Sequence, residues 1–244
     1  MLTWLDEHSP LPPGRTAMGP DDEVPGLVAA GGQVTPERLE EAYRKGIFPW
    51  FSAGQPVLWW SPDPRMVLRT SEFRVSRSLA KRIRQRRYEI RIDTAFARVV
   101  DGCAAPRDGS GGTWITPAMR DAYVELHRRG VAHSVEAWRE GSLRGGLYGL
   151  AIGRVFFGES MFAGETDASK VALAHLIEKL EADGVPLVDC QQDTAHLASF
   201  GARPVPRRAF AALLGELIHC DAPPAPWTAG PWQAVRHPET STPA

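Results

Sequence analysis

The chain has 244 residues, of which 43% are hydrophobic, and its formal net charge is −1. This length allows one large domain, or a small domain followed by a medium one, and the charge excludes a molecule that is cationic as a whole. No run approaches the roughly 18 to 20 apolar residues that cross a bilayer, and the start lacks a signal-peptide pattern, so we expect a cytoplasmic protein without a membrane partner.

Residues 1–34 are rich in proline and glycine and have few periodic apolar positions. A helix is predicted from Thr35 to about Lys45, because threonine is a good N-cap, proline suits the first helical position and Gly46 follows. The next segment, 47–65, contains several aromatic residues separated by prolines, which exclude a long regular element. These rings predict either an inter-domain core or a platform for a base, a ribose or an apolar side chain.

Many lysines and arginines fall within residues 74–91, although the whole chain is almost neutral. Such a segment is either a solvated helix face or a local patch that binds phosphates. Within it, a helix is predicted over residues 76–86. The candidate phosphate contacts on that helix are Arg77, Lys81, Arg82 and Arg84.

After Pro64, strands and helices alternate along the chain. Three successive strands joined by turn-like residues, a long amphipathic helix and a further strand are the layout of acetyl-coenzyme A-dependent N-acetyltransferase domains. We therefore predict an α+β fold, with a small N-terminal domain (1–65), an acyltransferase-like mixed sheet flanked by helices (66–235) and a disordered tail (236–244). The predicted strands are 66–68, 88–92, 132–139, 146–152, 154–157 and 185–189, and the further helices are 94–103, 116–130, one from 167 onward, and 207–219.

Polar residues follow two of these apolar runs. Glu159 comes just after residues 155–157, and Asp189 and Gln191 end the run that begins at Val185. Such groups are costly to bury without partners, so they indicate either a site for a polar substrate or a satisfied hydrogen-bond network at the strand ends. Strand alternation places Asp189 and Gln191 on one side and directs Cys190 to the other, toward the core.

The ordered set of short motifs in this chain resembles the leucyl/phenylalanyl-tRNA–protein transferase family. The resemblance covers about residues 24–210, and no single motif is decisive. The motifs are residues 46–51, 58–65, 112–116, 133–136, 158–162, 168–170 and 189–191.

The resemblance implies transfer of leucine or phenylalanine, with methionine left open, from aminoacyl-tRNA to the α-amino group of a protein that begins with Arg or Lys. The product would enter N-end-rule degradation, and the enzyme would be a monomer with no cofactor and no metal. The family's catalytic pair maps onto Asp189 and Gln191, and a further site glutamate maps onto Glu159. The other implied substrate contacts are Trp50 and Trp114, and an apolar pocket of Phe156, Met161, Leu173 and Val188, with Leu147 where a methionine is common. Thr194 stands where some members have asparagine.

The implied chemistry fits these residue types. An aminoacyl ester is already activated, so the enzyme must hold a neutral amine about 3 Å from the ester carbonyl and stabilise the developing charges. The Gln191 oxygen can accept an N–H bond from that amine, and Asp189 can orient the amide or stabilise positive charge. Glu159 can bind the ammonium of the transferred amino acid or of the incoming protein.

Three other functions compete with this interpretation. An acetyl-coenzyme A acetyltransferase needs a glycine-rich pyrophosphate loop, but residues 162–168 have one glycine and two acids, which would repel it. A non-catalytic RNA-binding protein leaves Asp189 and Gln191 without a role. A thiol hydrolase would depend on Cys190, and zinc is disfavoured because the seven histidines show no ligand spacing.

Overall fold

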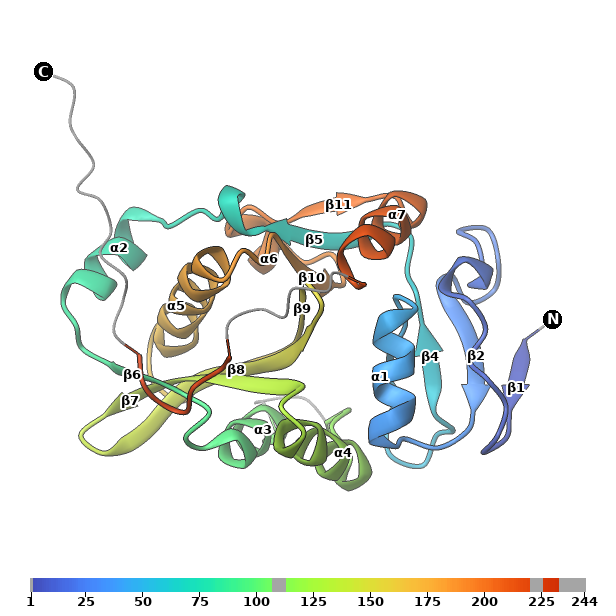
Figure 1. The fold of residues 1–244 in the computed structure, drawn as a ribbon, viewed down its shortest axis with the longest axis horizontal. Coiled ribbons are helices and arrows are strands. Elements are labelled where there is room, and N and C mark those ends of the chain that lie inside the picture. Colours follow the sequence, from blue (N-terminus) through green and yellow to red (C-terminus); the bar gives the residue numbers. More distant parts are fainter. Residues whose placement is uncertain (1, 107–112, 220–225, 233–244) are drawn as a thin grey trace, which may run out of the picture.

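The computed structural model describes residues 2–106, 113–219 and 226–232, which form two sheets with helices packed around them (Figure 1). The first sheet is small, with the strand order β1-β2-β4-β3. Helix α1 (Pro36–Arg44) lies between this sheet and the rest of the molecule (Figure 1). The strands of this sheet are β1 (Thr3–Leu5), β2 (Leu27–Gly31), β3 (Phe48–Pro49) and β4 (Leu58–Trp60).

The second sheet has eight strands in the order β11-β5-β10-β9-β8-β7-β6-β12. Strands β7, β8 and β9 form an antiparallel meander, whereas β10 runs parallel to β9. Helix α5 (Ala168–Ala182) makes the crossover between β9 and β10, as a parallel connection requires. The strands are β5 (Arg65–Arg69), β6 (Glu89–Ile92), β7 (Ala132–Arg139), β8 (Ser142–Ile152), β9 (Val155–Ala163), β10 (Leu187–Gln191), β11 (Arg203–Val205) and β12 (Gly230–Pro231).

The two faces of the large sheet bury different cores. Side chains such as Tyr148 and Phe157 face α3 (Phe96–Ala104) and α4 (Pro117–Arg128) and join the core of the N-terminal sheet. Alternate side chains such as Leu147 face α5 and form a second cluster with it. The remaining helices are α2 (Arg77–Arg84), α6 (Ala195–Ser199), α7 (Arg207–Leu217) and the short 3-10 turns η1 (Gly14–Thr16) and η2 (Thr70–Glu72).

The α+β class and the mixed sheet flanked by helices are confirmed. The predicted helix start at Thr35 is also observed, since the Thr35 Oγ1 accepts the Arg38 N–H at 3.1 Å. The strand predicted over 154–157 was too short, because β9 continues through Glu159 to Ala163. Residues 1–34 contain β1 and β2, which the sequence did not reveal.

The predicted domain boundary after residue 65 stays a prediction, and the predicted disordered tail lies outside the described residues. None of the helices in the described part of the chain combines the length and the apolar composition that crossing a lipid bilayer requires.

Candidate active site

A cavity of about 870 Å³ opens beside β9 and β10 and extends to the N-terminal sheet. Its volume suits a small-molecule-sized ligand, and its walls combine apolar, aromatic and a few polar side chains. All eight predicted substrate contacts line this cavity, together with one of the two predicted catalytic residues. The predicted residues that line it are Trp50, Trp114, Leu147, Phe156, Glu159, Met161, Leu173, Val188 and Gln191.

Glu159 reaches this cavity because β9 contains a bulge. Tyr148 pairs with Ser160 and Gly149 pairs with Gly158, so Glu159 is an extra residue between two paired positions. A bulge of this kind redirects a side chain that regular alternation would place elsewhere. Glu159 therefore lies within a strand, not after its end as the sequence suggested.

The Glu159 carboxylate is the centre of a hydrogen-bonded chain. Its Oε1 accepts a bond from Gln191 Nε2 at 2.7 Å, and its Oε2 accepts one from the Tyr123 hydroxyl at 2.7 Å. The Tyr123 hydroxyl also lies 2.7 Å from the Tyr43 hydroxyl. Because Tyr123 donates to the carboxylate, Tyr43 donates to Tyr123.

Burial raises the pKa of Glu159 to about 7, although the hydrogen bonds that it accepts from Tyr123 and Gln191 oppose the shift. The negative charge of Asp189 adds to the rise. The two tyrosines have pKa values well above their usual range, first because they are buried and then because Glu159 is close. Glu159 can therefore gain or lose a proton near neutral pH while both tyrosines remain donors.

Asp189 is fully buried and does not line the cavity. It forms a bidentate ion pair with Arg65, with Nε to Oδ1 at 2.8 Å and Nη2 to Oδ2 at 2.6 Å. Its Oδ1 also accepts the backbone N–H of Gln191 at 3.0 Å. Asp189 thus fixes the main chain at Gln191. Among the described residues, no hydrogen bond joins Asp189 to the Gln191 side chain, which donates to Glu159 instead.

The expectation that Asp189 and Gln191 share one side is wrong, because β10 is irregular at this point. The register with β5 shifts between these two residues, and Gln191 has a left-handed backbone with φ of 64°. As a result Gln191 lines the cavity and Asp189 does not. Simple alternation applies only to regular strands.

Cys190 also departs from expectation. It packs against the core cluster around α5, but it is only half-buried and lines the cavity. Burial raises the pKa of its thiol, and the Asp189 charge raises it further. A thiol that stays protonated is a weak nucleophile, so the thiol-hydrolase interpretation does not fit this site.

Arg65 connects the site to the rest of the molecule. Its guanidinium lies 4.8 Å from the centre of the Phe48 ring and 4.7 Å from that of Phe210, and it donates to the Gly46 carbonyl at 3.2 Å. A fully buried charge needs such partners. The residue therefore ties β10 to the segment between α1 and β3.

The predicted tRNA contacts lie on α2, apart from the described residues that line the cavity. Arg77, Lys81 and Arg84 are exposed, whereas Arg82 pairs with Asp167 at 3.2 Å. In Figure 1, α2 lies at the opposite end of the molecule from the N-terminal sheet. Their role as phosphate contacts stays a prediction.

Comparison with known proteins decides the family. The family model described as leucyl/phenylalanyl-tRNA protein transferase matches residues 67–215, and the model for the N-terminal domain of that transferase matches residues 32–63. The chain belongs to the leucyl/phenylalanyl-tRNA protein transferase family. The family resemblance drawn from the sequence motifs is thereby confirmed.

Similar curated members of the leucyl/phenylalanyl-tRNA protein transferase family cover almost the whole chain. The protein of that name from Azoarcus sp. (strain BH72) is 55% identical over 93% of this chain and 96% of its own length. The one from Stutzerimonas stutzeri (strain A1501) is 56% identical over 96% of this chain and 100% of its own length.

Two of the solved structures that match the chain are only distantly similar to it. The C-terminal DUF2156 domain of a protein from Agrobacterium fabrum has a TM-score of 0.44 and 13% identity, covering 77% of this chain and 70% of that one. L-PGS from Bacillus licheniformis has a TM-score of 0.38 and 12% identity, covering 67% of this chain and 53% of that one. Likenesses this weak support no argument about function.

Sequence reasoning missed Tyr43, Tyr123 and Arg65 as site residues of this transferase-family protein. The two tyrosines lie on helices and follow no local motif, and only their meeting in space marks them. Arg65 ends a family motif, but the motif alone assigns it no partner. Thr194, which replaces an asparagine of some members, lines the cavity, and its Oγ1 accepts the Leu197 N–H at 3.3 Å, a capping role that either residue can fill.

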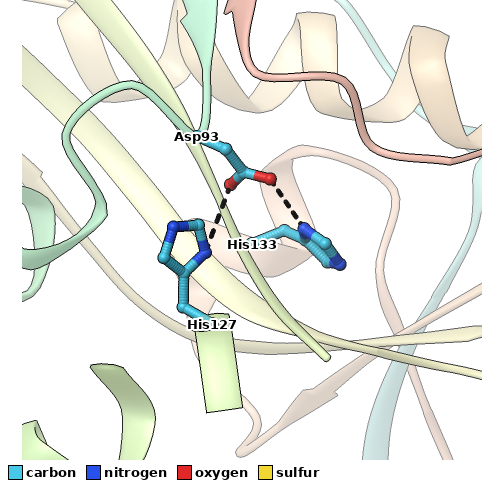
Figure 2. A group of neighbouring side chains, drawn as sticks. All are labelled: Asp93, His127 and His133. Carbon is cyan, nitrogen blue, oxygen red and sulfur yellow. Dashed lines mark hydrogen bonds and ion pairs between the residues drawn. The ribbon is translucent and has the colours of Figure 1, made fainter. Parts of the chain in front are cut away.

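Asp93, His127 and His133 form a compact group with ligand atoms of the kind that bind metals (Figure 2). The His133 Nδ1 lies 2.7 Å from the Asp93 Oδ2, which is a hydrogen-bond distance; ligand atoms around a tetrahedral zinc lie about 3.3 Å apart. The His127 Nδ1 already contacts the Ala132 carbonyl at 2.9 Å. This geometry favours a hydrogen-bonded group that joins α4 to β7.

Proposed function

We propose that this protein transfers leucine or phenylalanine from aminoacyl-tRNA to the α-amino group of proteins that begin with Arg or Lys, and so marks them for N-end-rule degradation in the cytoplasm. The observation that carries this proposal is one cavity in which an apolar pocket lies beside the Glu159–Gln191 pair. We further propose that it acts as a monomer without a cofactor. Family membership agrees with the donor and the reaction type.

The apolar wall of the cavity suits the side chain of the transferred residue. Leu147, Phe156 and Leu173 give a surface that accepts Leu or Phe by shape, and Met161 can repack around either because its side chain is flexible. Trp50 and Trp114 line the same cavity. Their rings provide faces on which the terminal adenine of the tRNA can stack.

The polar side of the cavity suits proton transfer during aminolysis. The incoming α-ammonium has a pKa of about 8, close to the value of about 7 for Glu159, so transfer of a proton to the carboxylate is nearly balanced. The neutral amine then forms the N–C bond, and the ester C–O bond breaks. The proton that Glu159 received then passes to water, which restores the carboxylate, and the second proton that the nitrogen loses ends on the ribose oxygen.

Gln191 orients the amine in this scheme. Its Nε2 donates to Glu159, so its Oε1 is the atom left to accept an N–H bond from the nucleophile. Asp189 acts as a positioning residue, because it holds the Gln191 backbone and is buried away from the cavity. The exposed cations of α2 would contact tRNA phosphates, which positions the acceptor stem without reading its sequence.

Incubation with leucyl-tRNA and a short peptide that begins with Arg tests the proposal. Mass spectrometry should show a gain of one leucine residue at the peptide's N-terminus. The same peptide with an acetylated N-terminus should gain nothing, because its nitrogen cannot attack the ester. If the free Arg peptide kept its mass while the tRNA stayed charged, the proposal would be wrong.

A further inference from the structure

The described C-terminal residues, 226–232, form a segment that docks on the edge of the large sheet. Gly230 pairs with Ile92 through β12, and the backbone N–H of Trp232 donates to the Ile90 carbonyl at 2.8 Å. Trp227 and Trp232, both half-buried, pack against the core cluster around α5. The segment therefore brings two large rings onto the face of the sheet that α5 covers.

Lys179 of α5 anchors both rings. Its side chain is almost fully buried, and its Nζ lies 4.7 Å from the centre of the Trp227 ring and 5.5 Å from that of Trp232. The Nζ also pairs with Asp183 at 2.7 Å. A desolvated cation over two indole faces stabilises this arrangement.

The two tryptophans differ in the side chains that they contact. The Trp227 ring stacks on Phe156, with 5.9 Å between centres and 27° between planes, and on His133 at 4.2 Å. The Phe156 ring also approaches the bare backbone of Gly149, so closely that an added Cβ there would lie 2.5 Å away. Phe156 lines the cavity, and Trp227 supports it from behind without lining the cavity itself.

We propose that Trp227 is a positioning residue that sets the size of the apolar pocket through Phe156, and thereby the discrimination between leucine and phenylalanine. This inference rests on the proposed function. The backbone at Gly149 blocks movement of the Phe156 ring in one direction, so Trp227 controls how far the ring can withdraw in the other. Removal of the indole opens space behind Phe156, and the pocket gains room for the larger substrate.

The test compares Trp227→Ala with Trp232→Ala, which removes the other ring over Lys179 but no stacking on Phe156. The measured quantity is the ratio of kcat/KM for phenylalanyl-tRNA to that for leucyl-tRNA, with one Arg-starting peptide as acceptor. In Trp227→Ala this ratio should rise at least about fivefold, since a pocket discriminates by about tenfold or more for each methylene it fits. In Trp232→Ala it should stay at the wild-type value.

An equal change of the ratio in both variants, or no change in Trp227→Ala, would overturn the inference. Trp227→Phe keeps a smaller ring in place, so it guards against a folding defect, and its ratio should lie between those of the wild type and Trp227→Ala. Binding of leucyl and phenylalanyl 3′-amide adenosines, measured by calorimetry, should show the same shift without any turnover. If the wild type transferred neither amino acid, the proposed function would fail, and the ratio of these two affinities would still decide the role of Trp227.

Discussion

Glu159 combines an unusual pKa with a position in the cavity wall. Only its carboxylate form can accept a proton, so transfer should increase as pH rises through about 7, in addition to the increase as the acceptor amine loses its proton near pH 8. Glu159→Gln keeps the shape and removes the titration. Its kcat/KM should be about 100-fold lower. When kcat/KM is measured from mildly acidic to mildly alkaline pH, the increase near pH 7 should be absent, and only the increase caused by deprotonation of the acceptor amine should remain.

The pH profile distinguishes catalysis from simple positioning. If Glu159 only held Gln191 in place, whatever its charge, the lower step would belong to another group, and the variant would lose activity equally at every pH and keep that step. A lower step that persists in Glu159→Gln would therefore contradict the proton-transfer role. Tyr123→Phe offers a second check, because it removes a hydrogen bond that lowers the Glu159 pKa and should move the step to higher pH.

The buried ion pair of Asp189 and Arg65 leads to a prediction about the stability of the protein. Both side chains are fully buried, so Asp189→Leu leaves an unpaired guanidinium and should lower the free energy of unfolding by about 3–5 kcal/mol. The double variant Asp189→Leu with Arg65→Met removes both charges and should be destabilised much less than the sum of the two single variants. Urea denaturation of the wild type, the two single variants and the double variant measures this coupling. Purely additive effects would show that the ion pair is not the reason for the loss of stability.

At the scale of single elements, the starts of several helices could be predicted from the sequence, whereas strand irregularities could not. Thr35, Ser76 and Thr116 each cap a helix through a bond to a residue three positions on, so the signal lies within one short window. The β9 bulge and the shift in β10 depend on partner strands. No local pattern contains that information.

The distance in sequence between interacting residues also decides which features of the site could be predicted. The apolar pocket residues could be predicted through the family motifs, and they do share one cavity. The bond of Arg65 to Asp189 joins residues 124 positions apart, and that of Tyr43 to Tyr123 joins residues 80 apart. Partners at such separations are fixed only by the packed fold, so the buried state of Asp189 and the tyrosine chain were not predicted.

The exposed positive charges of helix α2 are predicted to bind tRNA phosphates. The triple variant Arg77→Glu, Lys81→Glu and Arg84→Glu should weaken tRNA binding and flatten the plot of log affinity against log salt, by about 0.7–0.9 for each phosphate that these side chains neutralise. Filter binding over a range of salt concentrations measures this slope. Arg128→Glu on α4, whose wild-type side chain is 72% exposed, is the control and should leave the slope almost unchanged. Equal slopes in the wild type and the triple variant would exclude α2 from the tRNA interface.

For the whole molecule, the cavity depends on both sheets. Trp50 follows β3 of the N-terminal sheet, and it lines the cavity with residues of β9 and β10. Arg65 reinforces the junction, because its guanidinium contacts the Gly46 carbonyl from one side and Asp189 of β10 from the other. The position of the N-terminal sheet is therefore expected to affect substrate binding directly.

Three tryptophans in or next to the N-terminal sheet distinguish substrate binding from a contribution to folding. Trp50 is 45% exposed, so Trp50→Ala should change the unfolding midpoint little, yet it should raise KM for aminoacyl-tRNA about tenfold or more if the ring stacks on a base. Trp59 is fully buried and donates to the Gly31 carbonyl at 3.0 Å, so Trp59→Ala should cost about 3–5 kcal/mol of stability. Trp4 is 67% exposed and does not line the cavity, so Trp4→Ala should change neither quantity. Thermal melts and steady-state kinetics on the three variants test this pattern, and a wild-type KM in Trp50→Ala would exclude the N-terminal sheet from substrate binding through this ring.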